Sequence, residues 1–100
     1  MAKIPQDAAA EHRRLAILSC LYADADYRIN AVLLHSLLKT LDHGVPMSVF
    51  LADIVWLEQL RLVITETLPG CTMVLLRAEG AEVAEGLSVI PGIARPNKLV

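Results

Sequence analysis

The spacing of the hydrophobic residues changes once along this chain, near Leu62, and this change limits the possible folds more than any other feature. Up to about residue 60 the apolar side chains recur every three or four positions, which is typical of amphipathic helices. Two runs rich in β-branched residues then follow, 62–67 and 72–76, with Pro69-Gly70 as a turn signal between them. The pattern predicts helices followed by a β-hairpin.

Three helices are expected before the hairpin. The first follows Asp7, a good N-cap residue, and covers 8–23. The second follows Asn30, another good N-cap residue, and ends near Gly44, which we expect to adopt the left-handed backbone conformation there. The third extends from Pro46 to about Leu60, because proline is favoured in the opening turn of a helix.

The remaining segments complete a recognisable order of elements. A very short extended piece is expected at 27–29, and a short helix at 78–86. Two prolines and a glycine in 87–100 predict an extended, partly mobile tail. The order helix, short strand, helix, helix, hairpin, short helix predicts the α+β class and a winged helix-turn-helix fold. We therefore divide the chain into an N-terminal arm (1–6), a winged-helix domain (7–86) and the tail.

The composition favours a protein partner over a nucleic acid. The net charge is −2, whereas a dedicated DNA-binding domain usually carries a basic excess that neutralises phosphates. No apolar run approaches the roughly 18–20 residues that span a bilayer, and the N-terminus lacks the order of a signal peptide, so we expect a cytoplasmic protein without membrane contact. Hydrophobic residues make up 55% of the chain, more than so small a domain can hide. We expect an exposed apolar patch and a homodimer.

No metal, cofactor or catalytic site is expected. The histidines, His12, His35 and His43, are not spaced as metal ligands, and Cys20 and Cys71 lie far apart and are expected to be free thiols.

The remaining polar features give no catalytic group either. Glu79, Glu82 and Glu85 are typical of a solvated helix face. The chain has no glycine-rich phosphate loop, and Ser19 has no base near it in sequence. We predict a protein that is not an enzyme and has no small-molecule substrate.

The third helix is the most informative element for function. It has no Lys or Arg from Val45 to Leu60, and its outward positions are mostly apolar, whereas Phe50, Ile54 and Leu57 form its inward face. Asp53 interrupts the longest apolar run of the chain, 49–57. We expect an association surface on this helix, and its residues are Met47, Val49, Leu51, Val55 and Trp56. The alternative is that these side chains cover the protein's own wing and first helix.

Double-stranded DNA is the other partner to consider. The basic residues are scattered, and they could contact a DNA backbone only if the fold brings them together. The polar residues available for such contacts are Arg28, Lys39, Ser48, Arg61, Arg77, Arg95 and Lys98.

Several motifs together resemble a known family. The run D-I-V-W-L-E-Q-L-R-L-V (53–63) resembles the end of a winged-helix recognition helix passing into the wing, for which the usual form is D-L-x-W-L-x-x-x-G-L-V. With R-L-A-I-L (14–18), N-A-V-L-L (30–34) and I-P-G-I-A-R-P (90–96), it resembles a small family of Mu-like phages and prophages, often described as ArsR-like winged-helix proteins. Arg61 stands where the pattern has a glycine, so we expect the turn into the wing to be formed differently.

The resemblance implies a phage or prophage protein of the bacterial host's cytoplasm, with a DNA-binding, transcription-regulatory role. The alternative is a protein-interaction module, for dimerisation or for phage assembly and packaging, that keeps the winged-helix frame and binds little or no DNA.

Overall fold

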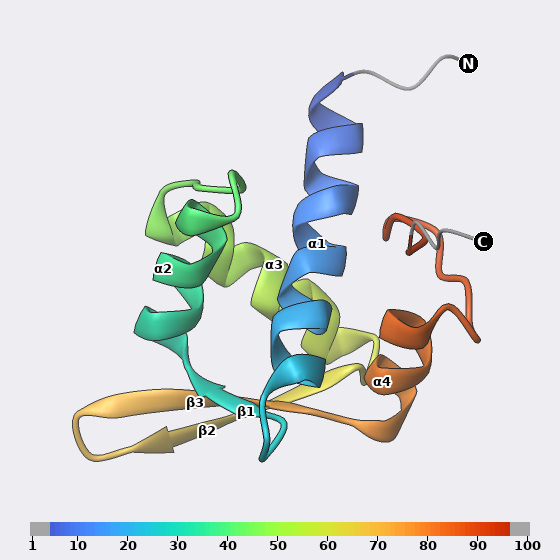
Figure 1. Ribbon diagram of the computed structural model, residues 1–100. Coiled ribbons are helices and arrows are strands. Elements are labelled where there is room, and N and C mark those ends of the chain that lie inside the picture. Colours follow the sequence, from blue (N-terminus) through green and yellow to red (C-terminus); the bar gives the residue numbers. More distant parts are fainter. Residues whose placement is uncertain (1–4, 97–100) are drawn as a thin grey trace.

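The computed structural model describes residues 5–96 (Figure 1). Helix α1 (Pro5–Ala23) is followed by strand β1 (Arg28–Asn30), and then by helices α2 (Ala31–Thr40) and α3 (Met47–Gln59). Strands β2 (Val63–Leu68) and β3 (Cys71–Leu76) form a hairpin, and helix α4 (Ala78–Glu85) comes after it. The predicted α+β class and the predicted order of elements are confirmed. The arrangement is compatible with a winged helix.

One antiparallel sheet lies beneath the helices (Figure 1). Its strand order is β1-β3-β2, so the short strand β1 pairs with β3 rather than with its neighbour in sequence, and Ile29 lies opposite Val74. The hairpin reverses at Pro69-Gly70, where Gly70 has φ +82°, a backbone conformation that favours glycine. This hairpin is the element that the sequence analysis interpreted as a wing.

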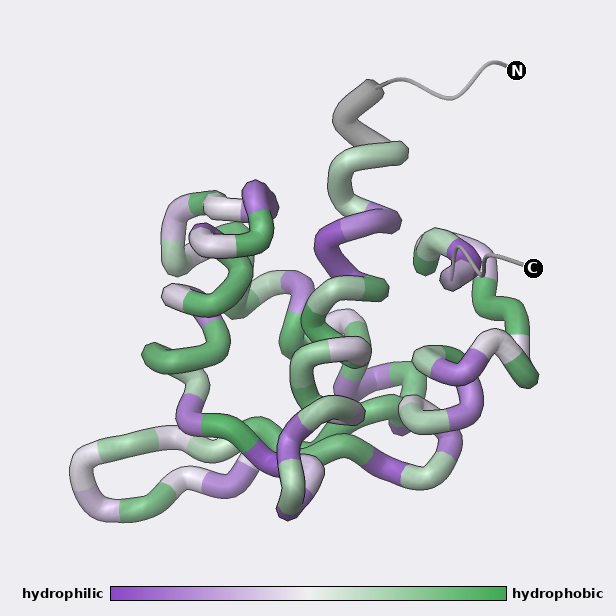
Figure 2. The backbone as a smooth tube through the Cα atoms, in the orientation of Figure 1, coloured by the Kyte–Doolittle hydropathy of each residue, from purple (hydrophilic) through white to green (hydrophobic). Residues whose placement is uncertain are grey.

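The core forms where the three long helices meet the sheet. Phe50 and Leu57 of α3 are fully buried, as the spacing of that helix predicted, and Ile54 is nearly so. The other fully buried large side chains come from α1, α2 and the sheet, and they are Ile17, Leu18, Leu21, Leu34, Leu38, Val63 and Val74. Figure 2 shows these hydrophobic stretches on elements that pack together, with a hydrophilic stretch in the upper half of α1.

Helix α2 does not end as predicted. We expected Gly44 to be left-handed, but Asp42 has that conformation instead, with φ +68°. The N–H of Asp42 donates to the carbonyl of Lys39 (3.2 Å), and the N–H of His43 donates to that of Leu38 (2.8 Å), which together form a Schellman motif. The chain has therefore already turned before it reaches the glycine, because aspartate is among the residues that tolerate this conformation best.

The turn from α3 into the hairpin uses the same motif. Arg61 has φ +62°; its N–H donates to the carbonyl of Glu58 (2.9 Å), and the N–H of Leu62 donates to that of Leu57 (3.0 Å). The expectation that Arg61 changes the form of this turn is wrong, because the arginine adopts the conformation that a glycine would take at that place.

Helix α1 begins earlier than expected, and the described part of the tail is packed against the domain. Helix α1 begins at Pro5, so Asp7 lies within the helix and is not its N-cap. The described part of the tail, 87–96, packs back on α1: Ile93 is buried, and the N–H of Ala94 donates to the carbonyl of Glu11 (3.1 Å). Within residues 5–96, no helix combines the length and the hydrophobicity needed to cross a bilayer.

Candidate functional site

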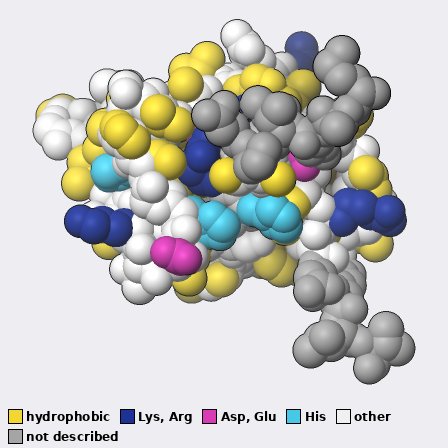
Figure 3. Space-filling view, turned by 90° about the horizontal axis from the view of Figure 1, so that it is seen from above, with side chains coloured by type: hydrophobic (Ala, Val, Ile, Leu, Met, Phe, Trp, Pro, Cys, Tyr) yellow, Lys and Arg dark blue, Asp and Glu magenta, His cyan; other side chains and the backbone are white. Residues whose placement is uncertain are grey.

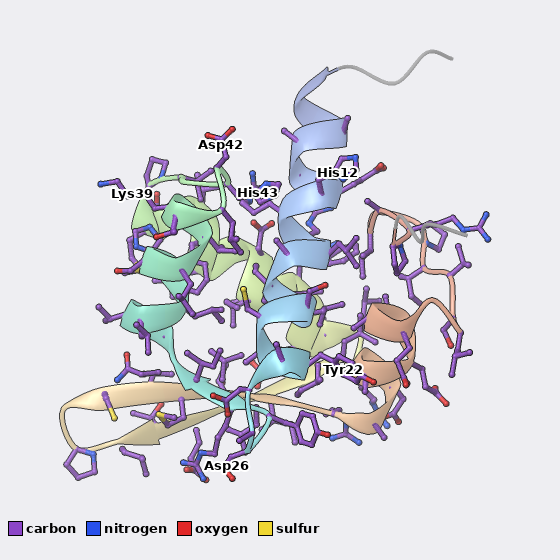
Figure 4. All side chains as sticks on the ribbon, in the orientation of Figure 1. His12, Tyr22, Asp26, Lys39, Asp42 and His43 are labelled. Carbon is purple, nitrogen blue, oxygen red and sulfur yellow. The ribbon has the colours of Figure 1, made fainter. Side chains whose placement is uncertain are left out.

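The residues proposed for DNA contact do not form one surface. Arg61 and Arg77 lie near each other at the base of the hairpin, because the N–H of Arg77 donates to the carbonyl of Leu62 (3.0 Å). Lys39 lies at the upper end of α2, far from the sheet (Figure 4). Arg95 is exposed in the segment that follows α4. Lys98 lies outside the described residues.

Two of these arginines already have acidic neighbours. Arg28 Nη2 lies 3.5 Å from Glu66 Oε1 on β2, and Arg77 Nε lies 3.6 Å from Glu79 Oε1. Carboxylates so close reduce the positive potential that a phosphate would meet. Ser48 is exposed on α3, but no Lys or Arg accompanies it on that helix.

The outward side of α3 is apolar and exposed. Val55 is 53% exposed, and Val49 and Leu51 are exposed as well, so the described part of the chain does not cover them. Met47 is half-buried against the core. These side chains remain available to a partner, which leaves the association surface as a proposal.

Trp56 has a different environment. The Arg14 guanidinium lies over its ring, 4.3 Å from the centroid, and Gly92 is so close that an added Cβ would stand 2.8 Å from Trp56 Cζ2. The ring is therefore half-buried between α1 and the segment after α4, and most of its contact surface is used within the protein.

A groove runs between α3 and the hairpin. Its volume is about 460 Å³, and its walls include Val32 at the start of α2, Met47 and Leu51 on α3, and Leu68 and Cys71 of the hairpin. None of the lining residues carries a charge. Sequence reasoning missed Val32 and Leu68, both exposed, because it looked for the association surface on one helix only. We call this groove and the exposed side of α3 the α3–hairpin face.

A buried network of ion pairs lies between α3 and α1, and sequence reasoning missed it too. The side chain of Asp53 is 4% exposed; Arg13 Nε donates to its Oδ2, and Arg14 Nε donates to its Oδ1 at 3.1 Å. Arg14 Nη1 also donates to the carbonyl of Gly92 (2.9 Å). The only signal in the sequence was an aspartate inside an apolar run. The network joins α1, α3 and the segment after α4.

His35 and Cys20 are packed within the fold. His35 Nε2 lies 2.7 Å from the carbonyl oxygen of Val45, and its ring packs on Phe50. Figure 3 shows histidine side chains on the upper surface among hydrophobic ones. Among residues 5–96, no group of three or more potential ligands is arranged to hold a metal ion. Burial raises the pKa of the Cys20 thiol, which makes it a poor nucleophile at neutral pH.

One comparison with known proteins identifies a relative. The chain is 37% identical over 90 residues to a protein of Escherichia phage Mu described as "Uncharacterized protein gp26", and the match covers 90% of this chain and 93% of the phage protein. No protein-family model matches the chain, and no solved structure does so either.

Proposed function

The chain belongs to the same family as gp26 of Escherichia phage Mu, and from this premise we propose that it is a winged-helix protein of a Mu-like phage or prophage that works by binding protein. We infer that the partner of the α3–hairpin face is a second copy of the chain. The protein is then a non-enzymatic association module.

The winged-helix assignment is supported by the order and pairing of the elements. Helices α2 and α3 follow α1 and are joined by a short turn, and the β2–β3 hairpin follows α3 directly. Strand β1 precedes α2 and completes the sheet by pairing with β3. In winged-helix proteins the helix in the place of α3 is the one that enters the DNA groove.

The observation that carries the protein-binding proposal is the lack of charge on the α3–hairpin face. A DNA-binding face needs cations, because neutralising phosphates provides most of the non-specific affinity. Helix α3 has no basic residue, and the groove beside it is lined by uncharged side chains. Two copies related by a two-fold axis would meet through this surface without like charges facing each other.

Sedimentation of a charge-inserted variant tests this proposal. Val49→Glu with Val55→Glu places two carboxylates on the exposed side of α3 and should convert a dimer into a monomer without changing the circular dichroism spectrum. The matched control is Gln59→Glu, which adds one charge at an exposed polar position of the same helix and should leave the dimer intact. A wild-type chain that sediments as a monomer at hundreds of micromolar contradicts the proposal.

DNA binding is the second candidate, and the order of the elements together with the pair Arg61 and Arg77 at the hairpin base favours it. A titration of random duplex DNA at increasing salt separates the two functions. Substantial affinity at low salt that falls steeply as salt is added supports a DNA-binding, regulatory role. Absence of binding at tens of micromolar supports the protein-interaction module.

A further inference from the structure

One edge of the sheet is open. Strand β2 lies at the end of the order β1-β3-β2, so it pairs with β3 on one side and with no strand of the described chain on the other. In an antiparallel pair, successive residues point their main-chain groups alternately toward the partner strand and away from it. The carbonyl of Leu62 accepts from the N–H of Arg77 at 3.0 Å, and so points toward β3. The groups of the alternate residues Val63, Thr65 and Thr67 therefore point away from β3.

The sequence of β2 is well suited to pairing with a further strand. Its residues are V-I-T-E-T-L, of which four are β-branched and one is charged. An open edge of this composition is a template for strand addition. A second β2 would meet it antiparallel about a two-fold axis, with Thr65 opposite Thr65 and Val63 opposite Thr67. Each outward N–H would then find a carbonyl on the other copy.

Glu58 occupies the centre of this open edge. It lies in the last turn of α3, and β2 passes beside it seven residues later. Its Oε2 accepts from the N–H of Thr65 at 3.0 Å and from the Thr65 hydroxyl at 3.0 Å. The main chain of Glu58 is fixed as well, because its carbonyl accepts from the N–H of Arg61 (2.9 Å) in the turn into the hairpin. The side chain therefore takes the hydrogen-bonding position that a partner strand would need at Thr65.

The position of Glu58 is unfavourable for the helix itself. The C-terminal end of a helix carries a partial negative charge, so a carboxylate in the last turn opposes the helix dipole. The last turn of α3 contains no basic residue that would offset this charge. What the carboxylate contributes in this structure lies outside the helix, in its contact with Thr65.

We propose that Glu58 protects the free edge of β2 from pairing with β2 of a second copy. Its carboxylate removes the central N–H of the edge from use. In a two-fold pairing the carboxylates of both copies would also meet beside the paired Thr65 residues, where like charges repel. Glu58 does not line the α3–hairpin groove, so the protection leaves that face free. The edge is protected whether or not the α3–hairpin face binds a second copy.

Hydrogen exchange of the ¹⁵N-labelled full chain tests the contact of Glu58 with Thr65. In the wild type the Thr65 amide should exchange more slowly than the Thr67 amide, although both point away from β3. Glu58→Ala should make the Thr65 amide exchange faster by about tenfold or more, because it removes a hydrogen bond to a charged group. The matched control is Gln59→Ala, which changes the neighbouring exposed side chain and should leave the Thr65 amide unchanged.

Sedimentation tests the protection of the edge. The background is the Val49→Glu, Val55→Glu variant, which is chosen to suppress association through the α3–hairpin face. Adding Glu58→Ala to this background should produce a larger species at hundreds of micromolar, whereas adding Gln59→Ala should not. Adding Thr67→Pro to the Glu58→Ala chain should restore the monomer, because proline removes an outward N–H and leaves the hydrogen bonds to β3 in place.

Three outcomes overturn the proposal. The first is a Thr65 amide that exchanges as fast in the wild type as in Glu58→Ala. The second is a Glu58→Ala chain that sediments as its background does. The third is association that persists after Thr67→Pro, which would place the contact away from the β2 edge. A wild-type chain that sediments as a monomer contradicts the α3–hairpin proposal alone, so the failure of one proposal is distinguishable from the failure of the other.

Discussion

Replacing Asp53 by asparagine should cost this protein a large share of its stability. The change keeps the shape of the side chain but removes the charge that faces Arg13 and Arg14, whose side chains are only 11% and 21% exposed. Removing one partner of a buried ion pair typically costs about 3–5 kcal/mol, because the other charge stays buried without compensation. The partial exposure of the two arginines lets them turn toward water, so we expect about 3 kcal/mol.

Urea unfolding measures this loss directly. Domains of this size unfold with a total stability of about 5–15 kcal/mol and a dependence on urea of about 1–3 kcal/mol per molar. The midpoint of Asp53→Asn should therefore fall by roughly 1–3 M. Trp56 is the only tryptophan, and it packs beside the same network, so its fluorescence reports the transition.

Two further variants test whether loss of the ion pairs to Asp53 causes the fall in stability. Gln59→Ala removes an exposed side chain from the same helix and should change stability by less than about 0.5 kcal/mol. Arg13→Gln combined with Asp53→Asn should cost clearly less than the two single changes added together, because the residues are in contact. A loss below about 1 kcal/mol for Asp53→Asn, or simple additivity in the double variant, would refute the reasoning.

Three other predictions follow from single features. Arg61→Gly should raise stability by about 0.5–1 kcal/mol in urea unfolding, because glycine adopts the left-handed conformation of Arg61 without strain; a loss would show that the arginine makes a contact worth more than that strain. Gly92→Ala should destabilise by about 1–3 kcal/mol and change the Trp56 emission spectrum, because Gly92 has φ +95° and no room for a Cβ. An unchanged spectrum would show that the Trp56 ring does not contact the segment around Gly92. The hydrogen bond to Glu85 raises the pKa of Tyr22 above its ordinary 10.0, so this stabilisation is complete below pH 10.0 and is lost as pH rises through the raised value. Absorbance titration of Glu85→Gln should show Tyr22 ionising at lower pH than in the wild type, and equal curves would contradict the assignment.

Much of the local structure could be read from the chain itself. Apolar spacing predicted the order of the helices and strands, and Pro69-Gly70 predicted the hairpin, because these preferences depend on residues only a few positions apart. The exposed apolar side of α3 follows from the same spacing, since Phe50, Ile54 and Leu57 already fill its buried side.

The tertiary structure determined which distant segments are in contact. The pairing of Asp53 with Arg13 and Arg14, about 40 positions away, has no counterpart in local spacing. The same holds for the packing of Gly92 on Trp56. Local preferences set which segments are helix or strand. Burial and long-range contact depend on how those segments cross in space, and no pattern along the chain records that.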